Sequence, residues 1–212
     1  LAFFGYLADD LDIDHALAER TLEALKTKPD QRGYEAFMTA VEPRRQELAR
    51  RLNRVPNATR QLVAMRADLL RLLPPDDPRM RIDCDFRHLF ASWFNRGFLV
   101  LRHISWESPA NILEKIIRYE AVHAISSWED LRRRVAPEDR RCFAFFHPAM
   151  PDEPLIFVEV ALTRGIASSV QALLSDERTP LAAHQADTAI FYSISNCQSG
   201  LAGISFGNFL IK

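Results

Sequence analysis

The last twenty residues of this 212-residue sequence have the types and spacing that most clearly suggest a ligand site. Gly200, Gly203 and Gly207 place three of the seven glycines within eight residues, directly after an apolar segment typical of a strand. Glycine lets a backbone approach a ligand closely, and N–H groups at the start of a helix bind phosphate oxygens. The pattern predicts a strand, loop and helix around a pyrophosphate-bearing ligand. The alternative is a plain turn between strand and helix.

The motif that comes nearest is the coenzyme A loop of GCN5-related acetyltransferases. In that loop Gln or Arg is followed by two residues, Gly, one residue, and Gly or Ala. Here the fit is loose, because Gln198 precedes Gly200 and Gly203 at a shifted spacing. In the other register, Ser205 replaces the first glycine before Gly207. Nucleotide loops of the GxxxxGK[ST] and GxGxxG types are absent, so the residues alone leave coenzyme A binding and a plain turn both open.

Two serines precede this loop on the predicted strand. Alternation places Ser193 and Ser195 on one face with Phe191, and residues 190, 192 and 194 on the other. Neither serine lies in a GxSxG elbow, which leaves a hydrolase triad without support. Ser195 is the nearer to the glycine loop. The alternative for both serines is a structural role, as small residues hydrogen-bonded within a sheet.

One acidic residue stands out within an apolar strand. Glu159 shares a predicted strand face with Leu155, Phe157 and Ala161. An unpaired carboxylate is costly to bury. Glu159 is therefore predicted either to pair with an arginine such as Arg164 or to line a wet cleft, and the sequence does not choose between them.

The elements that would position these residues change character along the chain. Apolar residues at spacings of three and four predict helices from residue 14 to about residue 73, with breaks at 28–30, 55–57 and 74–78, and again through 86–94. Ser108 and Pro109 predict a further helix start after Trp106. Residues 142–146, 155–162 and 188–195 predict three strands, the first two as an antiparallel hairpin, with a short helix over 167–174. The fold class is α plus α+β, with a helical bundle in residues 1–139 and a sheet domain in 140–212.

Composition excludes several classes of protein. With 27 basic and 28 acidic side chains the net charge is -1, so the chain lacks the positive excess of a nucleic-acid or anionic-membrane binder. Its longest apolar stretch, residues 155–162, is too short to cross a bilayer. Three widely spaced cysteines form no CxxC pair, which favours reduced thiols and a cytoplasmic location. The start without Met and the apolar end both suggest a piece of a longer protein.

Several separated blocks together resemble the malonyl-CoA decarboxylase family. They are EPLIFVEVAL at 153–162, TAIFYSIS at 188–195, GLAG at 200–203, GNFLIK at 207–212, WFNRGFL at 93–99, SWESP at 105–109, EAVH at 120–123 and WEDLRRRV at 128–135. The similarity extends from about residue 60 to residue 212; the helices before it agree only in character.

The resemblance implies a fold, a reaction and a partner. The fold is an N-terminal helical domain that makes homo-oligomer contacts, a tetramer in the family, followed by the first strands of a mixed sheet like that of GCN5-related acetyltransferases. The reaction converts malonyl-CoA to acetyl-CoA and carbon dioxide, with no metal or prosthetic group. It also implies a bacterial cytoplasmic enzyme, or a mitochondrial or peroxisomal one in a eukaryote. An acetyltransferase of the GCN5-related type and a non-catalytic oligomerisation module are the alternatives.

The resemblance also assigns residues. It implies that Ser195 is the catalytic serine, and that a segment at 167–173 contacts malonyl-CoA through Ser168, Ser169 and Gln171. Asn196 and Gln198 flank the site as side-chain donors by position, and the loop glycines Gly200, Gly203 and Gly207 bind coenzyme A. The catalytic histidine of the family lies in a His-x-x-Asn-Gly-Ala block, and none of the six histidines has that context. This chain by itself is therefore expected to be inactive.

Overall fold

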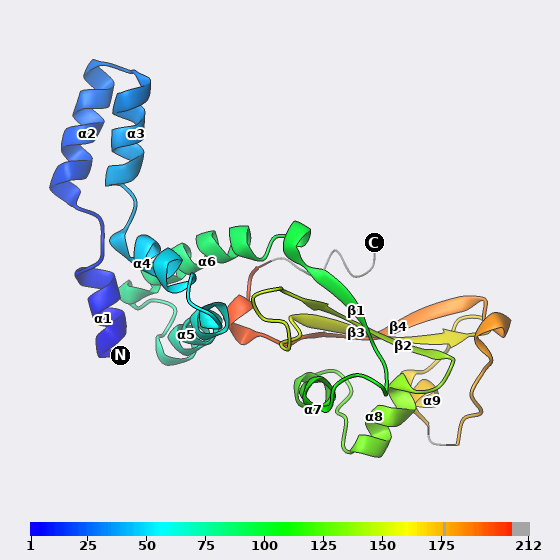
Figure 1. Cartoon of the computed structure of the whole chain (residues 1–212). Helices are drawn as coiled ribbons and strands as arrows, with labels where there is room; N and C mark the ends of the chain where they lie inside the picture. Colours follow the sequence, from blue (N-terminus) through cyan, green and yellow to red (C-terminus); the bar gives the residue numbers. More distant parts are fainter. Residues whose placement is uncertain (176, 205–212) are drawn as a thin grey trace. The chain divides into compact units, whose positions relative to one another are not determined.

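The computed structural model describes residues 1–175 and 177–204. The chain divides into two compact units, Leu1–Trp93 and Phe94–Lys212, and each is described by itself. The first unit is helical and the second contains a sheet (Figure 1). The predicted order, helices first and an α+β part second, is confirmed.

The first unit consists of helices along its whole length. They are α1 (Ala2–Asp9), α2 (His15–Thr27), α3 (Gln31–Ala40), α4 (Arg44–Leu52), α5 (Ala58–Leu72), the 3-10 helix η1 (Pro78–Met80) and α6 (Arg81–Trp93). The Asp14 and Asp30 side chains cap α2 and α3 by accepting hydrogen bonds from backbone N–H groups of the first turn. The sequence breaks at 28–30, 55–57 and 74–78 all fall between α-helices, as predicted, and residue 78 begins the 3-10 helix η1.

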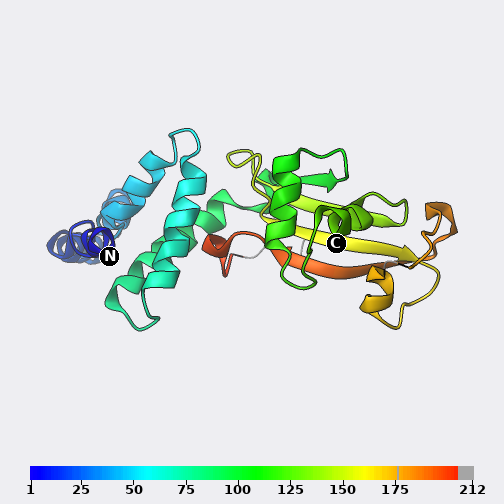
Figure 2. The same ribbon diagram turned by 90° about the horizontal axis from the view of Figure 1, so that it is seen from below.

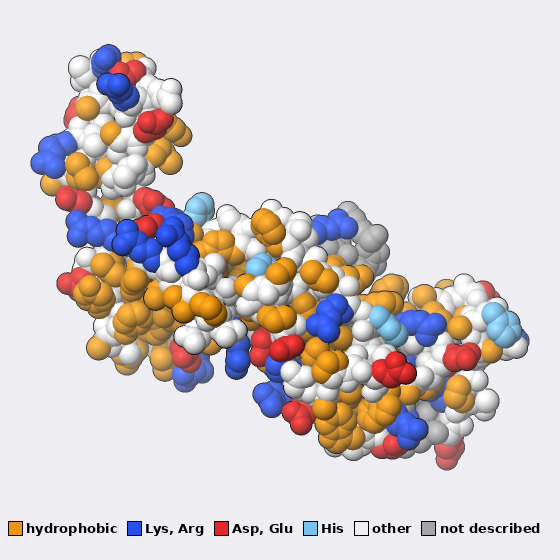
Figure 3. Space-filling model, in the orientation of Figure 1, with side chains coloured by type: hydrophobic (Ala, Val, Ile, Leu, Met, Phe, Trp, Pro, Cys, Tyr) orange, Lys and Arg blue, Asp and Glu red, His pale blue; other side chains and the backbone are white. Residues whose placement is uncertain are grey.

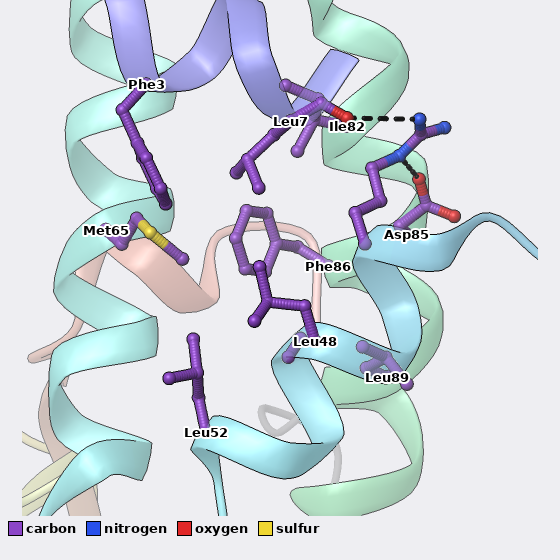
Figure 4. Close-up of a pocket in the computed structure, with 11 residues that line it drawn as sticks. Phe3, Leu7, Leu48, Leu52, Met65, Ile82, Asp85, Phe86 and Leu89 are labelled. Atoms are coloured by element: carbon purple, nitrogen blue, oxygen red, sulfur yellow. Dashed lines mark hydrogen bonds and ion pairs between the residues drawn. The ribbon is translucent and has the colours of Figure 1, made fainter. Parts of the chain in front are cut away.

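The core of the first unit lies between α1, α4, α5 and α6. Figure 4 shows apolar side chains from these helices converging, among them Phe3, Leu7, Leu48, Met65 and Phe86. They leave a cavity of only about 20 Å³, which is close to the space of a single water molecule. This cavity is a packing gap in an apolar core and is too small for a ligand.

The second unit is built on an antiparallel sheet in the order β1-β2-β3-β4. The strands are β1 (Val100–Ile104), β2 (Arg140–Phe146), β3 (Ile156–Thr163) and β4 (Thr188–Asn196). Its helices are α7 (Ala110–Tyr119), α8 (Trp128–Val135) and α9 (Val170–Leu174), with short 3-10 turns η2 (Arg96–Phe98), η3 (Ala183–Gln185) and η4 (Ser199–Leu201). The three predicted strands, the hairpin between the first two, and the helices near 110 and 170 are confirmed.

Helices α7 and α8 lie across one face of the sheet (Figure 2). Ile112 and Ile116 of α7 and Leu131 of α8 pack there against sheet residues such as Ala144 and Phe157, all of them buried. Register puts Ile104, Cys142, Glu159 and Ser193 side by side across the four strands on this same face. The buried polar groups of the unit therefore lie under α7 and α8.

The structure differs from the sequence-based expectations in two kinds of feature, unpredicted elements and strand register. Strand β1 and helices α1 and α8 were not predicted. Because β1 pairs with β2, and α7 and α8 pack on the sheet, the second compact unit begins at Phe94 and the expected boundary near residue 139 falls inside it. The second difference is a β-bulge: Val160 pairs with Phe191 and Glu159 with Ser193, so Tyr192 is an extra residue on β4.

The bulge changes which side chains share a face of β4. Because Tyr192 is inserted, Phe191 is exposed while Tyr192, Ser193 and Ser195 are all buried. The predicted grouping of Phe191 with the two serines is therefore wrong, and the grouping of the serines with each other is right.

Among the described residues, no helix is long and apolar enough to cross a bilayer.

Candidate active site

A cleft of about 560 Å³ opens where β4 ends and the glycine-containing loop begins. This volume is within the range of small-molecule sites. One wall is formed by Tyr119 at the end of α7 and Leu155 before β3. The other is the loop after β4, with Asn196, Cys197, Gln198, Ser199, Leu201, Ala202, Gly203 and Ile204.

The loop that lines this cleft is shaped by its glycines and internal hydrogen bonds. Gly203 has a φ of 76°, a left-handed conformation that favours glycine. Gly200 is buried within the η4 turn. The Gln198 side chain donates a hydrogen bond of 3.0 Å to the Pro154 carbonyl, which fixes the loop to the segment before β3. Gly207, and the helix expected to follow it, lie outside the described residues.

Next to the cleft, a buried carboxylate gathers four hydrogen-bond donors. Glu120 follows α7 directly and is only 7% exposed. Its Oε1 accepts hydrogen bonds of 2.8 Å from the N–H groups of Val122 and His123. The Ser193 hydroxyl donates to the same carboxylate at 2.8 Å, and the Ser195 hydroxyl at 3.2 Å. The carboxylate therefore connects the turn after α7 to β4.

The structure places the predicted catalytic serine within this cluster and not at the surface of the cleft. Ser195 is 2% exposed, and its hydroxyl is committed to Glu120 and lies 3.4 Å from the Ser193 hydroxyl. The cleft begins at the next residue, Asn196. Ser195 therefore lies behind the cleft wall. This geometry favours a supporting role for its hydroxyl over direct contact with a substrate.

The second buried acid, Glu159, is paired with an arginine other than the one expected. It is fully buried, and Arg134 of α8 approaches one of its oxygens at 3.4 Å, whereas Arg164 is exposed and donates to the Gln185 carbonyl. The other oxygen, Oε1, has no hydrogen-bond partner. Burial raises the pKa of Glu159 to about 7, since the attraction of Arg134 offsets only part of the desolvation.

The thiol in the cleft wall is an unreactive one. Cys197 is 6% exposed, and burial, followed by the proximity of Glu120, raises the pKa of its thiol far above the ordinary value. The thiol is therefore protonated at neutral pH and a poor nucleophile. Within the described part of the chain, no cluster of three or more His, Cys, Asp or Glu residues has a geometry that could hold a metal ion.

The other predicted substrate-contacting segment lies at the opposite end of β4. Ser169 immediately precedes α9 without making a capping hydrogen bond, and its hydroxyl donates to the Gln171 side chain. Ser168 and Gln171 are exposed. Residues of α9 border a separate hollow with Leu162 and Thr163, and Thr163 pairs with Thr188, the first residue of β4. A nine-residue strand spans about 26 Å. The structure therefore does not bring Ser168, Ser169 and Gln171 together with Asn196 and Gln198.

Topology explains that separation. Strands β3 and β4 are antiparallel neighbours, so the segment connecting them and the loop after β4 emerge at opposite ends of the pair. The two predicted strands already implied this result.

Glu120 was overlooked as a site residue, although the sequence contains a signal for it. It follows Ile112 and Ile116 at four-residue spacing, which continues the apolar stripe of the helix. A carboxylate on a buried stripe requires hydrogen-bond partners. Seryl hydroxyls and turn amides supply them here.

Comparison with known families decides what this fold and cleft belong to. The model of the malonyl-CoA decarboxylase C-terminal domain matches residues 97–212, and that of the malonyl-CoA decarboxylase N-terminal domain matches residues 11–94. The chain belongs to the malonyl-CoA decarboxylase family. The family identified from the sequence blocks is thereby confirmed.

Individual members of the family are similar over nearly the whole chain. Mitochondrial malonyl-CoA decarboxylases of Anser anser anser and Mus musculus are 39% and 36% identical, over 98% of this chain in both cases. Crystal structures of malonyl-CoA decarboxylases from Rhodopseudomonas palustris and Agrobacterium vitis are both 55% identical over 99% of this chain, with TM-scores of 0.93 and 0.94.

The chain accounts for only part of these proteins. It spans 44% and 45% of the length of the two curated relatives and 51% of each of the two crystallised chains. It matches both family models, so it contains residues of both the N-terminal and the C-terminal domain of the family.

Proposed function

We propose that the complete protein converts malonyl-CoA to acetyl-CoA and carbon dioxide. The observation that carries this proposal is the match of the two family models in order along the chain, with a ligand-sized cleft at the glycine loop of the second. In the reaction the bond between the carboxylate carbon and the α-carbon breaks, carbon dioxide leaves, and the electron pair forms the enolate of the thioester. A proton added to the α-carbon then yields acetyl-CoA.

Two kinds of group are needed for this chemistry. Preorganised hydrogen-bond donors stabilise the enolate oxygen, and a donor of this kind contributes on the order of 3 kcal/mol. A general acid supplies the proton, and we assign it to a histidine outside this chain, in line with the family resemblance. The part of the site within this chain is the cleft, which we propose holds the coenzyme A portion of the substrate by Asn196, Gln198 and the backbone of the loop at 199–203.

Coenzyme A is part of the substrate, and we propose that no further cofactor is required. Ser195 supports the cleft wall in this proposal. Its substrate-contacting role, and that of Ser168, Ser169 and Gln171, stay predictions. The cytoplasmic location is likewise proposed, in keeping with the bacterial origin of the structures that are 55% identical.

The direct test is an assay of the complete protein with malonyl-CoA. We expect acetyl-CoA and carbon dioxide in equal amounts. Transfer of an acetyl group from acetyl-CoA to an amine acceptor would instead indicate an acetyltransferase. Binding of coenzyme A without either reaction would contradict both enzymatic functions.

Replacing Asn196 by Ala tests the cleft itself. The Asn196 side chain is exposed on the cleft wall, so its removal should leave the fold intact and cost one substrate hydrogen bond. We expect KM for malonyl-CoA to rise about fivefold, which corresponds to about 1 kcal/mol. The matched control is Gln185→Ala, an exposed amide at the other end of β4. Equal KM values for the two variants would exclude the cleft as the binding site.

We also propose that the helical unit makes homo-oligomer contacts, a tetramer by family resemblance, through the α2–α3 hairpin. Helix α2 has no buried residue and α3 has only Ala40. Tyr34 and Met38 are exposed at four-residue spacing on α3, and apolar side chains lie among charged ones on the hairpin surface (Figure 3). Isolated helices of this length are marginal in water, so a second copy that covers the hairpin would stabilise it.

Light scattering tests the role of the hairpin. We expect the variant carrying Tyr34→Asp and Met38→Asp to have a lower mass in solution than the unmodified protein. Arg132→Asp, an exposed substitution on α8, should leave the mass unchanged. Unchanged mass in the hairpin variant would show that the contacts lie elsewhere.

A further inference from the structure

Strand pairing joins Leu155 in one cleft wall directly to Cys197 in the other, through a backbone hydrogen bond of 2.9 Å. The connection from Tyr119 to the second wall is made next to the cleft by one carboxylate. Tyr119 in one wall is followed directly by Glu120, and Asn196 in the other is preceded directly by Ser195. The hydrogen bonds from the Ser193 and Ser195 hydroxyls to Glu120 therefore bridge residues 73 and 75 positions apart in the sequence. Figure 1 shows α7 and β4 as separate segments of the second unit.

The Glu120 carboxylate is held in place by hydrogen bonds from both sides. Oε1 of Glu120 accepts from the amides of Val122 and His123, which fixes the carboxylate within the turn after α7. Both oxygens lie within 2.9 Å of the Ser193 hydroxyl, and the N–H of Ala121 approaches the Ser195 hydroxyl at 3.4 Å. Buried networks whose members are all satisfied hold a unique geometry.

Stability alone is a weak explanation for such a group. A buried carboxylate has a large desolvation cost, and an apolar side chain at the same position is often equally stabilising. Ile112 and Ile116 precede Glu120 on the buried stripe, so an apolar residue would have continued their packing. The acid instead directs hydrogen bonds to the strand that leads into the cleft.

We propose that Glu120, through Ser193 and Ser195, is a positioning residue that sets the place of Tyr119 relative to the loop after β4, and thereby the shape of the cleft for the acyl-CoA substrate. The proposal rests on the proposed function. Glu120 acts through the wall residues Tyr119 and Asn196 and does not touch the substrate. Loss of its hydrogen bonds should weaken substrate binding more than it slows the chemical step.

The experiment compares variants of the complete protein in steady-state kinetics and in direct titration with coenzyme A. For Glu120→Gln we expect KM for malonyl-CoA to rise about tenfold, with kcat within about twofold of the unmodified protein. Ser193→Ala should raise KM about threefold. Ser193→Thr, which keeps the hydroxyl, should have the KM of the unmodified protein. The variant carrying both Glu120→Gln and Ser193→Ala should be no worse than Glu120→Gln alone, because the two groups share one interaction.

The control is Asp187→Asn. Asp187 is also a carboxylate that accepts from a backbone N–H, that of Gly165, and from a hydroxyl, that of Thr188, but at the far end of β4. It should leave KM and coenzyme A affinity unchanged. If Glu120→Gln fails to fold, the Ser193→Ala and Ser193→Thr pair decides the question.

The positioning role would be overturned if Glu120→Gln kept the KM and the coenzyme A affinity of the unmodified protein. If Glu120→Gln does not fold, the same result in Ser193→Ala would overturn it. A fall in kcat at constant KM would overturn it too. Failure of the proposed function is distinguishable, since the unmodified protein would then form no acetyl-CoA. The coenzyme A titrations would still compare the variants in that case.

Discussion

Replacing Asp85 by Ala is expected to destabilise the helical unit by roughly 2–3 kcal/mol, because the buried Arg45 Nε and the Gln46 amide both lose their hydrogen-bond acceptor while Asp12 still pairs with Arg45. Arg45 of α4 is 7% exposed, and its guanidinium pairs with Asp85 of α6 (Figure 4). A second ion pair, of 2.9 Å, joins it to Asp12 before α2. It also reaches the Leu7 carbonyl of α1 at 3.4 Å. One arginine thus links α1, α4 and α6, and it sits at the edge of their apolar core.

Hydrogen exchange of the complete protein measures this effect locally, because peptides from α1, α4 and α6 report the opening of these helices. The control is Asp68→Ala, which removes an exposed ion pair with Arg71 on α5 and should cost at most about 0.5 kcal/mol. Equal protection of the three helices in both variants would mean that the Arg45 cluster contributes no more than a surface pair.

Replacing Glu159 by Gln is expected to remove a pH dependence of stability between about pH 4.5 and 7. Because burial raises the pKa of Glu159 to about 7, the folded chain holds this proton more tightly than the unfolded chain does. Its contribution to stability is therefore fully present below the unfolded pKa and is lost as the pH rises toward 7. The loss amounts to about 3 kcal/mol, at 1.36 kcal/mol for each pH unit.

Burial is the main cause of the raised pKa of Glu159, and the charges around it act in both directions. Arg134 of α8 and the Tyr192 hydroxyl lower this pKa, whereas the nearby Glu120 carboxylate raises it. Glu159→Gln should match the unmodified protein near pH 4.5 and exceed it in stability above pH 7.

The measurement is the free energy of urea unfolding across this pH range. Amide hydrogen exchange in peptides from β2, β3 and β4 reports the change locally. Glu129→Gln, an exposed acid on α8, should run parallel to the unmodified protein at every pH. Parallel curves for Glu159→Gln as well would show that the carboxyl titrates at its ordinary pKa in the folded state.

The sequence by itself determined most of the elements, because their patterns are local. Apolar residues at three- and four-residue spacing place the helices, and β-branched and aromatic runs place β2, β3 and β4, within a few residues of where they lie. The family was likewise readable from separated blocks of residues. The glycine loop beside a ligand-sized cleft was predicted by composition, since Gly203 requires a conformation that few other residues adopt.

Only the tertiary structure decided which polar groups meet. Glu120 reaches Ser193 and Ser195, and Arg134 reaches Glu159, across 25 to 75 positions of sequence, and no local pattern encodes such pairs. The bulge at Tyr192 turned Phe191 away from the two serines, because one extra residue reverses the alternation of side chains. The loop that contains Gly200 and Gly203 is therefore one wall of a cleft, and the Glu120 carboxylate, 75 positions away in the sequence, ties the strand that leads into this loop to the end of α7.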